Sequence, residues 1–251
     1  MSATSAPLPP AFYAAPATTR RALADWWVLL HPPYTLWHLA YVVIGASLAP
    51  RFDAVRLVAT LLAFFLAVGV CAHALDELHG RPLRTSIPSW QLAAAAAASL
   101  AGAVVVGIAG IGRVGPGLLV FIASGAAITC AYNLELVGGR LHNDMTFALA
   151  WGAFPVLTAY YAQAATLGLP AYVAAVGAYA LSSAQRALSA SARQLRRRTA
   201  DIEGTITDLD GTRTPITVTV LLVPLEHGLR AMTAGVVAIA TALVAYRVAR
   251  G

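Results

Sequence analysis

Long apolar runs occupy most of this chain, and they constrain its fold more than any other feature. Short turns with glycine or proline separate them, such as Ala49-Pro50 and the stretch from Gly110 to Pro116. An α-helix needs about 20 apolar residues to cross the hydrocarbon core of a bilayer. The sequence therefore predicts an all-α integral membrane protein with about eight transmembrane helices. The runs cover residues 35–50, 54–75, 89–111, 116–137, 145–163, 170–189, 214–226 and 231–248.

The low number of charged residues agrees with this prediction. Only 11% of the 251 residues are charged and 59% are hydrophobic, whereas a soluble domain carries about 25% charged residues. So few charges cannot cover a surface that faces water. Residues 1–30 begin with a stretch rich in Pro, Ala, Ser and Thr, which is typical of disorder. We expect an N-terminal cytoplasmic tail, largely disordered, over 1–30 and a single transmembrane helical domain over 31–251.

The net charge of +6 comes from arginine, since the sequence contains no lysine. Arginine scattered between apolar runs is typical of membrane topology, so we expect membrane lipids as partners and no nucleic acid. Eight spans with an inner N-terminus leave only Arg51, Arg56, Arg113 and Arg230 on the outer side. This predicts a multi-pass protein of the inner (plasma) membrane with both termini cytoplasmic. The inner side collects Arg20, Arg21, Arg81, Arg84, Arg140, Arg186, Arg193, Arg196, Arg197, Arg198, Arg213, Arg247 and Arg250.

A first polar cluster ends the second apolar run. His73, Asp76 and His79 are spaced i, i+3 and i+6, so they share one face of a helix, and Glu77 lies near His73. Two carboxylates and two imidazoles can hold a divalent cation: carboxylates suit Mg²⁺, and imidazole shifts the preference toward Zn²⁺ or Fe²⁺. The other interpretation is an ordinary polar helix end, terminated by Gly80.

A second polar cluster lies in the loop from 186 to 214. A basic block, Arg193 to Arg198, precedes the carboxylates of Asp201, Glu203, Asp208 and Asp210. One interpretation is a cytoplasmic loop whose arginines bind anionic lipid headgroups. The other is one arm of a polyanion site, in which carboxylates hold a metal and arginine binds phosphate through two hydrogen bonds.

Two polar loops on the inner side, after the second and sixth runs, resemble the arrangement in the UbiA-type superfamily of intramembrane prenyltransferases. Local phrases over most of the chain add to the resemblance. They are His31-Pro32-Pro33-Tyr34 with Val43-Ile44-Gly45-Ala46, Tyr132-Asn133-Leu134 with Gly139-Arg140, Trp151-Gly152-Ala153-Phe154-Pro155, Asp201-Ile202-Glu203-Gly204, and Gly211-Thr212-Arg213-Thr214.

The acidic motifs differ from the family pattern. The family's first motif is Asn-Asp-x-x-Asp-x-x-x-Asp, and the corresponding positions here hold Ala72, His73, Asp76 and Gly80. Thr205 stands where the second motif has an aspartate. The first motif thus keeps one of its carboxylates.

The resemblance implies a UbiA-like helical bundle and Mg²⁺-dependent transfer of an isoprenyl group from an isoprenyl diphosphate to a lipophilic acceptor. It also implies the roles of individual residues. Asp76, Glu77, Asp201, Asp208 and Asp210 would be catalytic. The metal ligands would be His73, Asp76, Glu77, His79, Glu203 and Asp208, and the diphosphate would be bound by Arg81, Tyr132, Asn133, Arg140 and Arg213.

Two alternatives stay open at the level of the sequence. One is a metalloenzyme on the same bundle, in which His73, Asp76 and His79 hold a transition metal such as Zn²⁺. The other is a non-enzymatic descendant of the same fold that binds a lipid or serves as a partner subunit.

Overall fold

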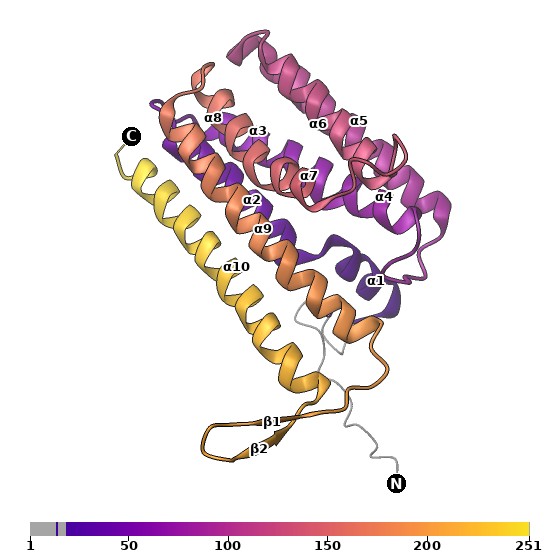
Figure 1. Cartoon of the computed structure of the whole chain (residues 1–251). Coiled ribbons are helices and arrows are strands. Elements are labelled where there is room, and N and C mark those ends of the chain that lie inside the picture. Colours follow the sequence, from indigo (N-terminus) through magenta and orange to yellow (C-terminus); the bar gives the residue numbers. More distant parts are fainter. Residues whose placement is uncertain (1–13, 15–18, 251) are drawn as a thin grey trace.

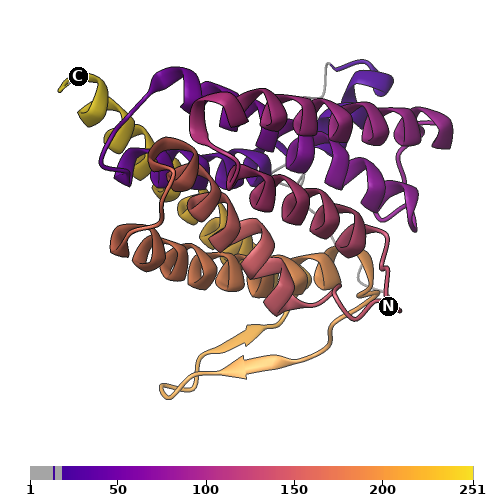
Figure 2. The ribbon, with the colours of Figure 1, turned by 90° about the horizontal axis from the view of Figure 1, so that it is seen from above.

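The computed structural model describes Ala14 and residues 19–250, and most of these residues are helical (Figure 1). The helices are α1 (Arg21–Leu30), α2 (Pro32–Leu48), α3 (Ala54–Phe64), α4 (His73–Leu78), α5 (Ser89–Val114), α6 (Leu118–Asn133), α7 (Asp144–Ala148), α8 (Phe154–Ala164), α9 (Leu169–Arg197) and α10 (Val218–Val248). Two π-helical segments, η1 (Phe65–Ala72) and η2 (Leu149–Ala153), join α3 to α4 and α7 to α8. The antiparallel hairpin of β1 (Thr205–Thr207) and β2 (Arg213–Pro215) projects from the bundle (Figure 2).

Three helices are long and apolar enough to cross a membrane: Ala54–Leu78, Ser89–Val114 and Val218–Val248. The first is the unbroken rod of α3, η1 and α4. Its start is set by Asp53, whose side chain accepts hydrogen bonds from the N–H groups of Val55 and Arg56 and so caps the helix. The all-α class predicted from the apolar runs is confirmed, and these helices support a membrane protein.

The predicted number of eight transmembrane helices is not confirmed. The runs at 214–226 and 231–248 form one helix, α10. The residues between them, 227–230, keep a helical backbone and do not form a turn. Pro224 lies inside α10, six residues after its start, where it removes one intrahelical hydrogen bond; transmembrane helices tolerate such a proline. The described residues therefore build seven long rods: α2, Ala54–Leu78, α5, α6, Asp144–Ala164, α9 and α10.

The described chain begins and ends at opposite ends of the bundle (Figure 1). Arg247, near the end of α10, donates from Nε to the carbonyl oxygen of Ser47 (2.6 Å) and from Nη2 to that of Ala49, at the end of α2. α1 lies at the other end of α2. The described chain runs along the bundle once in α10, so the predicted placement of both termini on one side of the membrane is not shown by this arrangement.

Part of the predicted disordered tail is also helical. Residues 21–30 form α1, which buries Leu29 and exposes Leu23 and Trp27. The side chain of Asp25 accepts a hydrogen bond of 2.9 Å from the backbone N–H of Ser86, which ties α1 to the loop after α4. The rest of the predicted tail, residues 1–13 and 15–18, lies outside the described residues.

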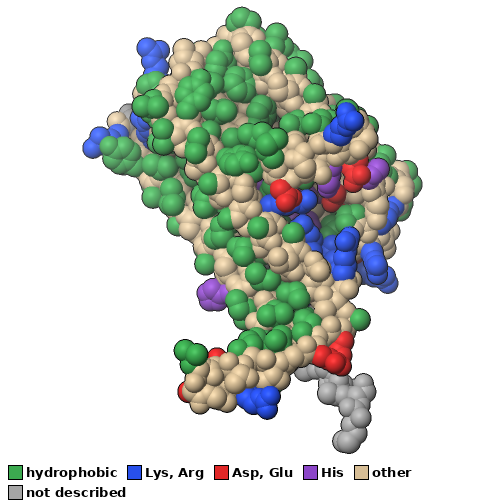
Figure 3. All heavy atoms as spheres, in the orientation of Figure 1, with side chains coloured by type: hydrophobic (Ala, Val, Ile, Leu, Met, Phe, Trp, Pro, Cys, Tyr) green, Lys and Arg blue, Asp and Glu red, His purple; other side chains and the backbone are tan. Residues whose placement is uncertain are grey.

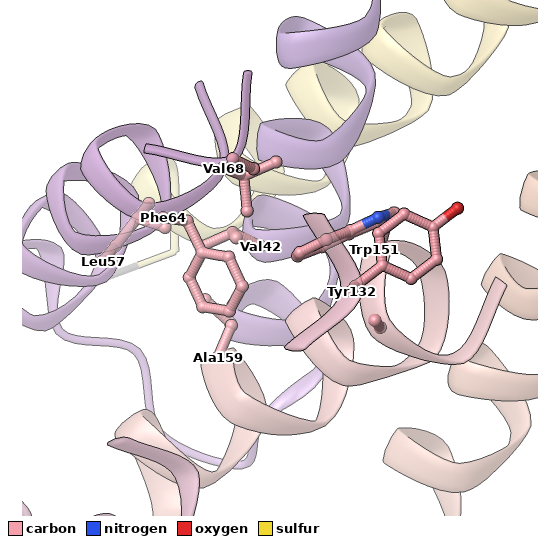
Figure 4. Close-up of a cluster of buried hydrophobic side chains, with 10 residues drawn as sticks. Val42, Leu57, Phe64, Val68, Tyr132, Trp151 and Ala159 are labelled. Atoms are coloured by element: carbon pink, nitrogen blue, oxygen red, sulfur yellow. The ribbon is translucent and has the colours of Figure 1, made fainter. Parts of the chain in front are cut away.

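A buried apolar cluster holds the middle of the bundle together (Figure 4). Its side chains come from α2, α3, η1, α6, η2 and α8. The tightest approach is between α2 and α8, where a Cβ atom at Gly45 would overlap the carbonyl oxygen of Val156. The cluster contains Val42, Ala46, Leu57, Phe64, Val68, Ala72, Tyr132, Ala150, Trp151 and Ala159.

Candidate functional site

A polar cavity of about 430 Å³ opens at the end of the bundle that carries α1 and the hairpin. This volume lies in the range of small-molecule sites, about 300–1,000 Å³. Figure 3 shows basic, acidic and histidine side chains gathered around a hollow in this part of the surface, while apolar side chains are spread over much of the rest. Five of the six histidines of the sequence line the cavity: His31, His38, His73, His79 and His142.

Two of these histidines are oriented by the π-helical segments. The Nδ1 atom of His73 lies 3.0 Å from the carbonyl oxygen of Gly69 in η1. The Nδ1 atom of His38 lies 2.7 Å from the carbonyl oxygen of Trp151 in η2. A carbonyl oxygen only accepts, so Nδ1 carries the hydrogen in both rings. π-helical turns inside α-helices are frequent at functional sites, and both of them contribute here to the same cavity.

His142 is oriented in the same way from the loop between α6 and α7. Its Nδ1 atom lies 3.0 Å from the carbonyl oxygen of Tyr132, and its ring stacks on the Tyr132 ring with the centroids 4.4 Å apart. This contact holds the loop against the end of α6.

Helix α9 supplies the positive charge of the cavity. Arg186, Arg193 and Arg197 are spaced by seven and four residues, so they lie on one face of α9, and Arg198 follows at its end. Arg186 Nε lies 2.9 Å from Asp144 Oδ1. Arginine is well suited to phosphate because its planar group donates two parallel hydrogen bonds.

The cavity carries an excess of positive charge, since Asp76 and Glu135 are the acidic residues among the lining residues. Burial lowers the pKa of His31, between α1 and α2, well below its usual value, and the neighbouring His73, Arg197 and Arg193 lower it further. A dense set of cations in a partly buried cavity attracts an anionic ligand.

The floor of the cavity is apolar. Val68, Tyr132 and Trp151 belong to the buried cluster of Figure 4 and also line the cavity. The rings of Tyr132 and Trp151 meet edge to face with the centroids 5.8 Å apart, and Phe147 lies 6.3 Å from Tyr132. An anion held by the arginines would thus have aromatic surface beneath it.

The structure brings five of the predicted site residues together in this lining. They come from the end of the rod Ala54–Leu78 and from the end of α6. They are His73, Asp76, His79, Tyr132 and Asn133.

Glu77 has a different position from the one expected of a metal ligand. It is fully buried, and its carboxylate accepts hydrogen bonds from Leu83 N–H (2.9 Å), Thr85 N–H (2.8 Å) and the Thr85 hydroxyl (2.9 Å). These bonds use both carboxylate oxygens. Glu77 therefore anchors the loop 79–88, which forms the rim of the cavity.

Two predicted phosphate-binding arginines lie outside the lining. Arg81 donates to the carbonyl oxygen of Ile87 and to the Ser89 hydroxyl, both at 2.6 Å, and has a positive φ of 52°. It shapes the loop 79–88 from within. Arg140 is exposed in the loop after α6.

The predicted second acidic arm is not part of the cavity either. Asp201, Glu203, Asp208, Asp210 and Arg213 are all exposed, in or beside the β-hairpin. The hydrogen bond that Asp210 accepts from the backbone N–H of Thr212 lowers the pKa of the Asp210 carboxyl. These residues form a local turn, and the structure does not bring them together with His73 and Asp76.

Several lining residues were not identified from the sequence as site residues. The sequence contains a pattern that predicts the shared face of the α9 arginines, since positions 186, 193 and 197 recur at helical spacing. The helix continues beyond the apolar run 170–189, so apolarity alone does not show that these positions are helical. His31 and His38 were inconspicuous within apolar surroundings. The residues missed are His31, Tyr34, His38, Glu135, His142, Gln185, Arg186 and Ser189, whereas Arg193, Arg197 and Arg198 belong to the basic block that the sequence indicated as a possible phosphate-binding arm.

The donor set does not fit the divalent metal that the resemblance implies. Of the predicted ligands, Glu77 is saturated by the loop 79–88, while Glu203 and Asp208 are exposed beside and in the hairpin. Among the described residues, no three His, Cys, Asp or Glu side chains are placed to hold a metal ion. A bound Mg²⁺ or Zn²⁺ would need ligands that this arrangement does not bring together.

Comparison with known proteins identifies no relative of this chain. No protein-family model matches the sequence, and searches of curated proteins and of solved structures find no match.

Proposed function

We propose that this chain is a multi-pass membrane transferase that binds an isoprenyl diphosphate in the polar cavity and passes the isoprenyl group to a second substrate. The observation that carries the proposal is the juxtaposition of three arginines on α9, Arg198 at its end and an aromatic floor in one cavity of an apolar bundle. The resemblance of the sequence to the UbiA-type superfamily points to the same substrate class.

We place the cavity on the cytoplasmic side of the inner membrane. Cytoplasmic loops carry an excess of arginine, and most arginines lie at the end of the bundle where the cavity opens. The far end holds Arg51, Arg56, Arg113, Arg247 and Arg250. The cavity end holds Arg20, Arg21, Arg81, Arg84, Arg140, Arg186, Arg193, Arg196, Arg197, Arg198 and Arg213.

In this proposal the arginines neutralise the diphosphate. A diphosphate leaves with the bonding electron pair only when its negative charge is stabilised, and fixed cations in a partly buried site do so effectively. Arg193 and Arg197 line the cavity from one side of α9, and Arg186 lies about two turns before Arg193 along the same helix. No step requires a metal held by the described carboxylates.

The aromatic floor suits the other half of the substrate. Cleavage of the bond between C1 and the diphosphate leaves positive charge on the allylic carbon, which the faces of Tyr132 and Trp151 stabilise. Apolar surroundings also keep water from the reacting carbon.

An apolar cleft offers space for the hydrocarbon chain. It has a volume of about 560 Å³ and lies between α3, α5, α6 and α8. Phe64 and Phe154 line this cleft and pack in the same cluster as Trp151, which lines the polar cavity. We propose that the distal part of the chain occupies the cleft.

A non-enzymatic lipid-phosphate binder is the second candidate. It is favoured by one observation, the exposed position of Asp201, Asp208 and Asp210 away from the cavity. A binder needs the arginines and the cleft but no group that promotes cleavage. The predicted metalloenzyme built on His73, Asp76 and His79 is not supported, for the reason of donor placement given above.

Conversion of the bound diphosphate separates these two candidates. Purified protein in detergent would be loaded with geranylgeranyl diphosphate labelled at C1 and incubated with a mixture of candidate acceptors and with water alone. Release of diphosphate together with a labelled alcohol or prenylated product supports the transferase. Recovery of intact substrate after prolonged incubation, with binding retained, supports the binder.

A further inference from the structure

Three histidines present the same nitrogen to the polar cavity. His38, His73 and His142 all line it, and each uses Nδ1 for a hydrogen bond to a backbone carbonyl group. None of their Nε2 atoms makes a hydrogen bond with a described residue. In the neutral ring that carries its hydrogen on Nδ1, Nε2 is an acceptor. The lining of the cavity therefore contains three imidazole acceptors that the described residues leave to a ligand.

These acceptors are distributed around the cavity. His38 belongs to α2, His73 to α4, and His142 to the loop before α7. The ring centroids of His38 and Tyr132 lie 6.2 Å and 6.3 Å from that of Phe147, and the Tyr132 ring stacks on His142. The His73 ring lies 5.4 Å from that of His31. The surrounding rings fix the orientation of the imidazoles.

A plain diphosphate does not use these groups. Fully ionised phosphate oxygens accept hydrogen bonds, which the arginines of α9 donate, but they have nothing to donate to an imidazole lone pair. A polar group that a ligand covers without a hydrogen bond costs free energy. The ligand that fits the whole cavity carries both negative charge and hydrogen-bond donors.

We infer that the cavity binds a hydroxyl-bearing phosphate, whose phosphate shares the cavity arginines with the diphosphate of the isoprenyl substrate and whose hydroxyl groups donate to Nε2 of His38, His73 and His142. This inference rests on the proposed transferase function and names the class of its second substrate. In the transfer, the hydroxyl oxygen forms a bond to C1 of the isoprenyl chain. The C1–O bond to diphosphate breaks, the electron pair leaves with the diphosphate, and the hydroxyl proton passes to an imidazole Nε2.

Two small phosphates with the same carbon skeleton test this inference. Glycerol 2-phosphate and isopropyl phosphate carry the same charge at pH 8 and differ only in two hydroxyl groups. Their affinities for the full chain in detergent, with EDTA present, would be measured by calorimetry. We expect glycerol 2-phosphate to bind about fivefold more tightly or better, since each neutral hydrogen bond contributes a few-fold in affinity. Equal affinities would overturn the inference.

Substitution of the histidines tests whether their imidazole groups cause the difference in affinity between the two phosphates. His73→Phe and His142→Phe remove an acceptor and keep a ring, so each should reduce the affinity ratio toward one while isopropyl phosphate binds as before, which also shows that the variant is folded. The matched control is His227→Phe, because His227 is exposed on α10 and lies outside the cavity lining, so this variant should keep the affinity ratio of wild type. A ratio that survives in both His73→Phe and His142→Phe would overturn the assignment.

Titration of the same preparation with geranylgeranyl diphosphate separates this inference from the proposed function. If this lipid binds and the two small phosphates bind equally, the hydroxyl-phosphate inference fails and the isoprenyl site stands. If the affinity ratio holds but the lipid does not bind, the proposed isoprenyl function fails and the hydroxyl-phosphate site stands.

Discussion

Glu77 Oε1 accepts a hydrogen bond of 2.8 Å from the backbone N–H of Thr85, eight residues later in the chain. This bond, with those to Leu83 N–H and the Thr85 hydroxyl, fixes a loop in which Arg81 and Arg84 have positive φ values of 52° and 54°. Such backbone conformations persist only where the surrounding contacts hold them. The buried carboxylate is what determines the rim of the polar cavity.

Replacement of this anchor should loosen the loop. Glu77→Ala leaves two backbone donors and a hydroxyl without their acceptor, and we expect the variant to lose about 2 kcal/mol of stability. Hydrogen exchange of residues 79–88 should rise well above that in wild type, while α5 and α6 stay protected. The control is Glu135→Ala, since Glu135 is exposed at the cavity mouth. Unchanged exchange in Glu77→Ala would contradict the anchoring role.

The hairpin carboxylates should have little effect on ligand binding. Asp208 and Asp210 are exposed and absent from the cavity lining. We expect Asp208→Asn and Asp210→Asn to bind geranylgeranyl diphosphate within about twofold of wild type, as is usual for surface substitutions. The measurement is a binding titration of each variant. A loss of more than tenfold in either one would show that the hairpin closes over the cavity and takes part in binding.

Periodicity was sufficient to predict the helical class, because runs such as 89–111 and 116–137 need no information beyond their length and apolarity. It was insufficient for α10. The polar residues around His227 and Arg230 suggested a loop, whereas a helix can carry them on an exposed face. Local spacing also predicted that His73, Asp76 and His79 share a site, and the structure places all three in one cavity.

Contacts between segments that are distant in the sequence could not be predicted from residue spacing. Spacing alone places Glu77 on the same helix end as Asp76 and does not show that its carboxylate turns back toward Thr85. The acidic residues after α9 resembled a metal-binding motif, but the hairpin holds them outside the bundle. His38 joins the site only because α2 packs against η2, 113 residues away.

Since residues 218–248 form one helix, we expect the hairpin and the end of α10 to lie on opposite sides of the membrane. Cysteines placed at Leu209 in the hairpin and at Arg250 after α10 should react from opposite sides of the membrane, in a background in which Cys71 and Cys130 are replaced by serine. A membrane-impermeant maleimide applied to intact cells should label Arg250→Cys, and label Leu209→Cys only after the cells are opened. Labelling of both from one side would mean that residues 218–248 cross the membrane twice or not at all.

The apolar cleft should control the length of the isoprenyl chain. Ala63→Phe narrows the cleft between α3 and α5, so we expect the affinity for the C20 diphosphate to fall about tenfold while that for the C10 diphosphate stays within twofold. Ala97→Phe, on an exposed face of α5 outside the cleft, is the control and should change neither affinity. Equal losses for both chain lengths would place the chain elsewhere.

Binding of geranylgeranyl diphosphate with Mg²⁺ and again with EDTA tests the central claim most directly. The arginines of α9 and the lack of a fitting ligand set predict tight binding that persists in EDTA. Arg193→Gln should weaken it at least tenfold, since a half-buried charge-assisted contact to phosphate is lost, whereas Arg140→Gln, outside the cavity lining, should not. Binding that disappears with EDTA, or that is insensitive to Arg193→Gln, would contradict the account of an arginine-based diphosphate site.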